Sequence, residues 1–216
     1  MTATLKINEI FYSIQGEALY AGMPCVFVRL TGCNLRCVYC DTCYAYDEGA
    51  GMSIDEIMEK ISAYPCRLVE ITGGEPLCQE AAPRLIGRLL DAGYTVLLET
   101  NGSMDLGSVD PRCIKIMDIK CPGSGASQKN NLNNLKYLSS CDQVKCVITC
   151  AGDYEFAKNI LRSTILSDQS IPVLFSPASN MMAPATLAEW ILADGLNVRL
   201  QLQLHKILWP NDCKGR

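Results

Sequence analysis

Apolar residues in this chain recur in short runs, separated by stretches with a helical repeat. Several runs are apolar almost without interruption, as in strands covered on both faces of a sheet. Alternation of such runs with helices predicts an α/β fold with parallel core strands, in a sheet that is open or curled into a partial β/α barrel. The expected strands are Ile7–Tyr12, Cys25–Leu30, Leu68–Thr72, Thr95–Thr100, Ile114–Ile119, Val144–Thr149, Val173–Ser176 and Val198–Leu204.

The stretches between the runs carry helix signals. Ser53-Ile-Asp-Glu56 has the sequence of a capping box, and Gly93 follows another amphipathic stretch as a C-terminal cap. Ligands of such folds bind at the carboxyl ends of the strands, so polar motifs at these ends are candidate site residues. The expected helices run from Ser53 to about Ala63, from near Ala82 to Ala92, and over Asn131–Leu138, Tyr154–Leu166 and Pro184–Ala193.

The composition narrows the class of protein. The length of 216 residues fits one domain, and 49% hydrophobic with 19% charged residues excludes a disordered chain or a coiled coil. The net charge of −4 and the lack of a basic run argue against direct binding to nucleic acid. The first twenty residues do not resemble a secretory signal, and no apolar run is long enough to span a membrane. We expect a cytoplasmic protein without membrane contact.

Thirteen cysteines are many for such a chain, and their number is odd. A secreted disulfide framework does not fit the length or the missing signal. In a reducing compartment we expect some cysteines to bind metal and the others to serve as small buried apolar residues.

Three cysteines follow the expected strand Cys25–Leu30 at close spacing. Cys33, Cys37 and Cys40 are separated by three and two residues, so one loop could wrap around a cubane and give a thiolate to each of three irons. The fourth iron would stay open to a small chelating molecule. Cys43 leaves two alternatives: a four-ligand zinc site, or a ferredoxin-type run that here lacks the usual Cys-Pro ending.

The CxxxCxxC loop after the first strand of an α/β chain resembles the radical S-adenosylmethionine (SAM) superfamily. The resemblance implies a 4Fe-4S cluster whose open iron is chelated by the amino and carboxylate groups of SAM. One electron from the cluster would cleave the sulfonium, and the 5′-deoxyadenosyl radical would abstract a hydrogen from the substrate. Tyr39 would lie beside the adenine.

Other strand ends complete this implied cosubstrate site. In Thr72-Gly-Gly74-Glu-Pro76 the two glycines allow close backbone approach, and the resemblance places Thr72 toward the substrate. A lysine at a strand end is usually a solvated charge, but Lys120 could neutralise the SAM carboxylate. The resemblance assigns SAM contacts to Tyr39, Cys40, Asp41, Gly74, Asp118, Ile119, Lys120, Ser176, Pro177, Ala178 and Ser179.

The ends of the chain narrow the resemblance further. Glu9-Ile-Phe-Tyr-Ser-Ile-Gln-Gly-Glu17 and Gln203-Leu-His-Lys-Ile-Leu-Trp-Pro210, together with the cluster loop, are similar to the 7-carboxy-7-deazaguanine synthase family. This resemblance implies conversion of 6-carboxy-5,6,7,8-tetrahydropterin to 7-carboxy-7-deazaguanine with ring contraction and loss of ammonia, in queuosine biosynthesis. It also implies Mg²⁺, a homodimer, and an external one-electron reductant of the flavodoxin or ferredoxin type.

Individual substrate residues follow from the same resemblance. Arg29 would pair with the substrate carboxylate, and Thr42 would bind Mg²⁺ through its hydroxyl. The plainer interpretations are an ordinary ion pair for Arg29 and a turn hydroxyl for Thr42. The family's substrate contacts fall on Ile14, Gln15, Gly16, Arg29, Thr72 and Pro210.

The whole chain is expected to form one radical SAM domain, with a strand and substrate loop in residues 1–24, the barrel core in 25–204 and a tail in 205–216. Two other functions stay open from the residues alone. A glycyl-radical-enzyme activating enzyme also joins CxxxCxxC to a short α/β chain. A non-enzymatic iron–sulfur electron carrier could use Cys37, Cys40 and Cys43.

Overall fold

A single sheet curves around an inner face, and helices cover its outside. The computed structural model describes residues 3–164, 166, 170–210 and 214–215. The strands are β1 (Thr4–Ile14), β2 (Pro24–Leu30), β3 (Ala50–Ser53), β4 (Leu68–Gly73), β5 (Thr95–Thr100), β6 (Ile114–Asp118), β7 (Gln143–Ile148), β8 (Val173–Pro177) and β9 (Arg199–Leu200). Their order is β3-β1-β2-β4-β5-β6-β7-β8-β9. β1 pairs antiparallel with β2 and β3, and all other neighbours are parallel.

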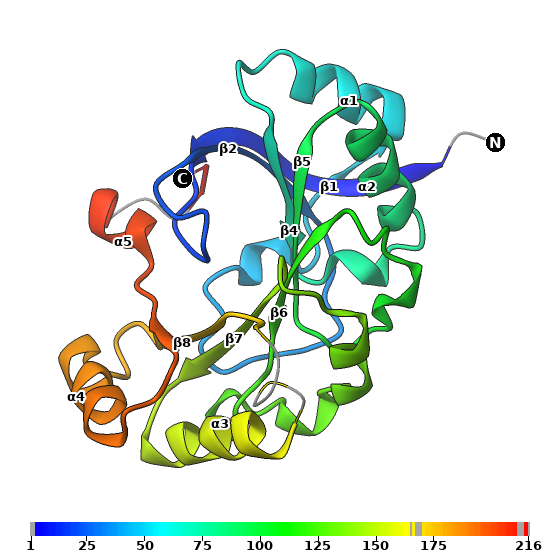
Figure 1. The fold of residues 1–216 in the computed structure, drawn as a ribbon. Helices are drawn as coiled ribbons and strands as arrows, with labels where there is room; N and C mark the ends of the chain where they lie inside the picture. The colour runs from blue at the N-terminus through cyan, green and yellow to red at the C-terminus, as the bar shows by residue number, and fades with distance from the viewer. Residues whose placement is uncertain (1–2, 165, 167–169, 211–213, 216) are drawn as a thin grey trace.

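The sheet winds in one direction, because β4 to β9 follow one another in space as in sequence. β3 and β9 are its two edges, so the barrel is partial and open, as the apolar pattern predicted. Figure 1 shows α1 to α4 outside the curved sheet and α5 beside the blue loop that follows β1. The helices are α1 (Ile54–Ser62), α2 (Ala82–Asp91), α3 (Ala151–Ser163), α4 (Pro184–Asp194) and α5 (Leu204–Leu208); short 3-10 helices are η1 (Cys43–Ala45), η2 (Pro76–Cys78), η3 (Leu106–Ser108), η4 (Pro122–Ser124), η5 (Ser127–Lys129) and η6 (Leu132–Tyr137).

The two faces of the sheet carry different sets of apolar residues. Along β2, Val26, Val28 and Leu30 belong to the large core beneath the helices, whereas Cys25 and Phe27 belong to a small cluster on the inner face. Beyond that cluster, toward the carboxyl ends of the strands, the inward positions become polar. We call these residues the inner polar layer: Arg29, Glu70, Thr72, Glu99, Asp118, Lys145 and Ser176.

Glu70 marks the border between the apolar and polar parts of the inner face. Its Cα pairs with those of Phe27 and Leu97, and the residue is only 3% exposed. Burial and the charge of Glu99 raise the pKa of Glu70 well above its ordinary value, although the side-chain amide of Gln15 donates a hydrogen bond to it. The carboxyl is therefore protonated at a higher pH than that of an exposed glutamate.

Most expected elements are present, but the strand expected at Val198–Leu204 is wrong in extent. Only Arg199–Leu200 pairs with β8, and Leu204 begins α5. The side chains of Gln201 and Gln203 turn inward to accept or donate hydrogen bonds at Ala18 and Glu17, which ends the extended run. The short strand β3 was not expected, because Ala50–Ser53 has no apolar run.

Two expected helices also differ. The helix expected at Asn131–Leu138 is the 3-10 helix η6, because Asn134 directs its side chain to the backbone of residues 102–106 instead of leaving it outside a regular helix. The helix expected at Tyr154–Leu166 begins earlier, at Ala151, and ends at Ser163. Residue 165 of that expectation lies outside the described residues. The three remaining helices are confirmed, and Gly93 has a φ of 80° after α2.

In the part of the chain that the structure describes, no helix combines the length and the apolar character that crossing a membrane requires.

The capping box at the start of α1 allows a stability prediction. The Ser53 hydroxyl accepts from Glu56 N, and the Glu56 carboxylate accepts from Ser53 N at 2.7 Å. Ser53→Ala should lower the free energy of unfolding by about 1 kcal/mol in urea denaturation. Ser62→Ala, near the other end of α1, should change it by less than about 0.5 kcal/mol. If both variants lowered the free energy of unfolding equally, the capping box would not stabilise α1 as expected.

Glu70 gives a prediction for the pH dependence of stability. The pKa of Glu70 is higher in the folded protein than in the unfolded chain, where it is about 4.3. Protonation of Glu70 therefore favours folding. That contribution is complete below the unfolded pKa and is lost as the pH rises through the folded pKa. Relative to the parent, Glu70→Gln should therefore gain stability between pH 5 and pH 8, measured by urea midpoints. The exposed control Glu59→Gln should keep a constant difference; a constant difference for Glu70→Gln would contradict the expectation.

Candidate active site

The cysteine loop leaves the carboxyl end of β2 and is held by hydrogen bonds along its length. Cys33, Cys37 and Cys40 are each partly buried, with free thiols. Leu35 N donates to Cys33 Sγ at 3.4 Å, and Val38 N donates to the carbonyl of Ser124 at 3.0 Å. These bonds fix part of the cysteine loop against η4.

The three thiols fit a cubane better than a single ion. Among the described residues, no three metal-binding side chains converge tightly enough to hold one ion. Thiolates that each bind a different iron do not need to converge in this way. Cys33, Cys37 and Cys40 are close enough to interact electrostatically. Burial raises the pKa of Cys33 and Cys37, and the nearby Lys120 opposes this rise, as is useful where thiolates must form.

A fully buried carboxylate holds three loops together at this edge of the sheet. Glu75 accepts from Leu77 N at 3.0 Å, from the Thr100 hydroxyl at 2.9 Å and from Asn101 N at 2.7 Å. Its own backbone N–H donates to Gly32 O at 2.8 Å, beside Cys33. Burial nevertheless raises the pKa of Glu75. The loops after β2, β4 and β5 therefore share one anchor.

The glycines of the loop after β4 are required by close approach. A Cβ on Gly74 would lie 2.2 Å from Gly32 O and 2.7 Å from Cys33 Cβ. Gly73 has a φ of 152°, and a Cβ there would lie 2.3 Å from Leu30 O. Gly74 thus lies directly against the cysteine loop, and a larger side chain there would push the two loops apart.

Buried polar atoms without partners lie next to the cysteines. Tyr39 Oη and Asp118 Oδ1 are buried and have no hydrogen bond within the described residues. Burial, followed by the charge of Asp118, raises the pKa of Tyr39. Lys120 Nζ donates to the other Asp118 oxygen at 2.7 Å, and Ile119 between them is fully buried. Such atoms, left unsatisfied beside three thiols, suit a polar ligand.

The segment expected to contact SAM from β8 reaches the same edge of the sheet. Ser176 and Pro177 end β8 and are buried; Ala178 follows, and its N–H donates to Ile148 O at 2.8 Å. Ser179, in contrast, is exposed.

Arg29 and Thr72 are neighbours on adjacent strands, as their Cα atoms pair between β2 and β4. Arg29 Nε donates to Glu9 Oε1 at 2.8 Å, and its guanidinium lies 5.8 Å from the ring centres of Phe11 and Tyr44. Among the described residues, nothing accepts a hydrogen bond from its two terminal nitrogens. Arg29 is thus partly an ion pair, with its outer edge available for an anion.

The loop after β1 meets the C-terminal segment. Gln15 is buried, and Gly16 O accepts from Leu204 N at 2.9 Å. A Cβ on Gly16 would lie 2.3 Å from His205 Nδ1, so a larger residue there would force His205 to move. Ile14 ends β1, half-buried. Pro210 is exposed after α5, and no described hydrogen bond links it to the residues expected with it.

Asp41 connects the cysteine loop to that C-terminal segment. It accepts from Lys206 Nζ at 2.7 Å and from Gln203 Nε2 at 3.3 Å. Burial raises the pKa of Asp41, but the charge and hydrogen bond of Lys206, with hydrogen bonds from Thr42 and Gln203, outweigh this and lower the pKa below the ordinary range. The Thr42 hydroxyl donates to Asp41 Oδ1 at 3.0 Å, so the hydroxyl oxygen retains lone pairs for a cation.

The structure adds site residues that the sequence analysis did not select. Asn101 donates to Asn34 Oδ1 at 3.0 Å and lies 3.9 Å from Cys33 Sγ. The other additions share one signal, an ionisable residue within or beside an otherwise apolar strand run, which is costly unless it is paired. They are Glu17, Glu70, Glu75, Glu99 and Lys145.

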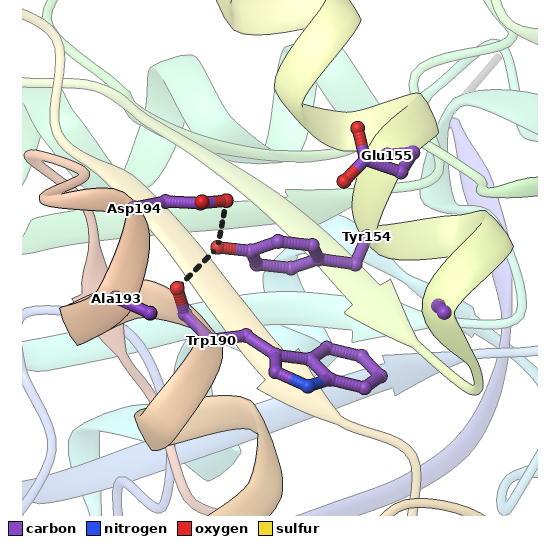
Figure 2. Close-up of a pocket in the computed structure, with 6 residues that line it drawn as sticks. Tyr154, Glu155, Trp190, Ala193 and Asp194 are labelled. Atoms are coloured by element: carbon purple, nitrogen blue, oxygen red, sulfur yellow. Dashed lines mark hydrogen bonds between the residues drawn. The ribbon is translucent and has the colours of Figure 1, made fainter.

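One surface hollow lies elsewhere. A hollow of about 300 Å³ lies between α3 and α4, and Tyr154 and Trp190, drawn in Figure 2, are among the residues that line it. The Tyr154 hydroxyl bonds to Trp190 O and to Asp194, and Lys158 pairs with Asp194. The Tyr154 hydroxyl and the Asp194 carboxylate are thus already paired, and none of the expected site residues lines this hollow.

Comparison with known proteins agrees with the geometry. The model of the "Radical SAM superfamily" matches residues 27–118. A 7-carboxy-7-deazaguanine synthase of Koribacter versatilis is 44% identical over 98% of this chain and 100% of its own length. One of Chlorobaculum tepidum is 46% identical over 99% of this chain and 98% of its own.

Solved structures share the fold. QueE from Escherichia coli matches with a TM-score of 0.77 at 24% identity, over 94% of this chain and 95% of its own. Streptococcus suis SuiB bound to S-adenosylmethionine matches with a TM-score of 0.53 at 13% identity, over 80% of this chain and 45% of its own. The full-length relatives decide the assignment, and the chain belongs to the 7-carboxy-7-deazaguanine synthase family of the radical SAM superfamily.

Proposed function

We propose that this protein converts 6-carboxy-5,6,7,8-tetrahydropterin to 7-carboxy-7-deazaguanine, with ring contraction and loss of ammonia, in the 7-deazapurine branch that leads to queuosine. The observation that carries the proposal is the 44% and 46% identity to relatives of that name over nearly their whole length. The geometry agrees, because the three thiols and the inner polar layer meet at one edge of the sheet.

The residues at this edge would bind the cofactors. Cys33, Cys37 and Cys40 would hold a 4Fe-4S cluster, which supplies the electron that cleaves SAM and so starts hydrogen abstraction. The unsatisfied Tyr39 Oη and Asp118 Oδ1 support a polar cosubstrate beside them. We assign SAM contacts to Tyr39, Cys40, Asp41, Gly74, Asp118, Ile119, Lys120, Ser176, Pro177, Ala178 and Ser179.

The inner polar layer would orient the substrate. The outer edge of Arg29 suits a carboxylate, since a planar guanidinium matches two oxygens. Thr72 lies beside it on β4, and Gln15 of the loop Ile14–Gly16 bonds to Glu70 of the same layer. We call the inner face of the sheet at this layer, together with the loop that contacts it, the chamber. Thr42 would bind the Mg²⁺ that holds the substrate carboxylate. Pro210 would also contact the substrate, as the resemblance implies.

Several broader features belong to the same proposal. Residues 1–216 would form one domain, which agrees with the single continuous sheet. The protein would work in the cytoplasm as a homodimer, and a flavodoxin- or ferredoxin-type protein would reduce its cluster. No direct contact with nucleic acid is needed for a pterin substrate, and the net charge of −4 agrees with this.

The two alternative functions are not favoured. The identity of 44% and 46%, over nearly the full length, to relatives named 7-carboxy-7-deazaguanine synthase argues against a glycyl-radical activating enzyme. An electron carrier would use Cys43, which is exposed in η1, and would not need the polar chamber beside the loop.

An anaerobic assay of the reconstituted protein tests the proposal. With SAM, Mg²⁺, dithionite and 6-carboxytetrahydropterin, mass spectrometry should detect 7-carboxy-7-deazaguanine, and Cys40→Ala should abolish it. Formation of 5′-deoxyadenosine alone would keep the radical chemistry and reject this substrate. Absence of both products at full iron content would reject the enzyme altogether.

The role of Thr42 gives a separate prediction. Thr42→Ala removes the hydroxyl oxygen, and loss of a ligand should raise the Mg²⁺ concentration for half-maximal rate by roughly tenfold or more. Thr42→Ser keeps the hydroxyl and serves as the matched control, with a Mg²⁺ dependence near that of the parent. If Thr42→Ala titrates like the parent, Thr42 is not a Mg²⁺ ligand.

A further inference from the structure

The inner polar layer contains a buried ammonium group that no assigned role uses. Lys145 projects from β7 into the chamber, and its side chain is only 6% exposed. Its Nζ donates to Glu17 Oε2 at 2.8 Å and to Glu99, and it lies 4.0 Å from Asp118 Oδ2. One cation thus connects β5, β6 and β7 to the loop that follows β1.

A buried charge needs a reason, because its desolvation cancels much of the attraction to its partners. The outer face provides a comparison: Lys115 and Asp142 are buried as a pair 3.5 Å apart. Lys115 Nζ also donates to Cys113 O, and Asp142 accepts from the backbone of Lys115 and Ser139. That pair fixes the local backbone beneath the helices. The partners of Lys145 lie on the chamber side instead.

Of the partners of Lys145, Glu17 is the one farthest away in the sequence, and it directly follows the expected substrate loop. Glu17 also accepts from Gln201 Nε2 at 3.0 Å and from Gln203 Nε2 at 2.9 Å. Burial raises the pKa of Glu17, but the charge of Lys145, together with hydrogen bonds from Gln203 and Lys145, outweighs this and lowers the pKa. Lys145 therefore keeps the Glu17 carboxylate ionised and in place.

The same loop is tied to the chamber at further points. Leu19 N donates to the side chain of Gln143, which is also on β7, at 2.8 Å. Glu17 N donates to Gln15 Oε1 at 3.1 Å, so the position of Glu17 is transmitted to Gln15. Gln15 in turn contacts Glu70 in the inner polar layer. The side chains of β7 hence set where the loop Ile14–Glu17 lies.

We propose that Lys145 is a positioning residue for substrate binding: through Glu17 it fixes the loop Ile14–Glu17 against the chamber. This role rests on the proposed function, because the loop is assigned to the pterin there. Lys145 acts through Glu17 and does not need to touch the pterin itself. Its loss should weaken pterin binding more than it slows the chemical step.

The test compares Lys145→Met with the matched control Lys115→Met. Hydrogen–deuterium exchange should be faster over residues 14–23 in Lys145→Met and unchanged there in Lys115→Met. With saturating SAM, Lys145→Met should raise KM for 6-carboxytetrahydropterin by roughly tenfold or more, with a smaller change in kcat. Lys115→Met should lower thermal stability but keep KM, and Lys145→Arg should recover part of the loss.

Lys145→Met could fail to fold because Glu17 and Glu99 would lose their cation. The double variant Lys145→Met/Glu99→Gln keeps the net charge and should show the same faster exchange over residues 14–23, whereas Glu99→Gln alone should leave that exchange unchanged. Unchanged exchange over residues 14–23, or equal KM changes in the Lys115 control, would overturn the proposal. If the parent does not convert the pterin, the proposed function fails, and the exchange measurement still decides the role of Lys145.

Discussion

The site depends on one carboxylate that never reaches solvent. Glu75 accepts hydrogen bonds from its own loop and from the loop after β5, while its backbone bonds to the loop of Cys33. Without it, three strand ends would place their loops independently. Because burial of a carboxylate is unfavourable unless its oxygens are satisfied, the same group penalises every arrangement in which the loops separate. The cysteine loop, the loop after β4 and Asn101 are thus held together as one unit.

The curved sheet supplies the other half of the site. Strands that alternate inward and outward residues give the inner face an apolar floor around Phe27 and Leu97 and a polar rim above it. The floor excludes water from below, so charges in the rim interact strongly. Burial and the charge of Glu99 raise the pKa of Glu70, and although burial lowers the pKa of Lys145, its acidic neighbours raise it well above the ordinary value. A polar, planar substrate is matched by such a chamber.

Local signals predicted the parts of this protein that depend on local physics. The capping box at Ser53 and the glycine cap at Gly93 are short-range patterns, and both appear where the sequence predicted them. The spacing of the three cysteines is another such pattern, and Cys33, Cys37 and Cys40 lie in one loop with free thiols. Contacts between distant segments were not predictable in this way. The pairing of Glu17 with Lys145 and of Asp41 with Lys206 depends on how the sheet curves. Val198–Leu204 was mistaken because Gln201 and Gln203 leave the sheet for long-range partners.

Because the barrel is open, its inner face is completed by contacts between segments far apart in the sequence. The partners of the loop after β1 lie near the other end of the chain: Ala18 N bonds to Gln201 and Gly16 O to Leu204. During synthesis the amino-terminal strands and Cys33–Cys40 leave the ribosome long before these partners exist. The chamber is therefore completed only once the segment around Gln201 and Leu204 has been made and has folded back against the loop after β1.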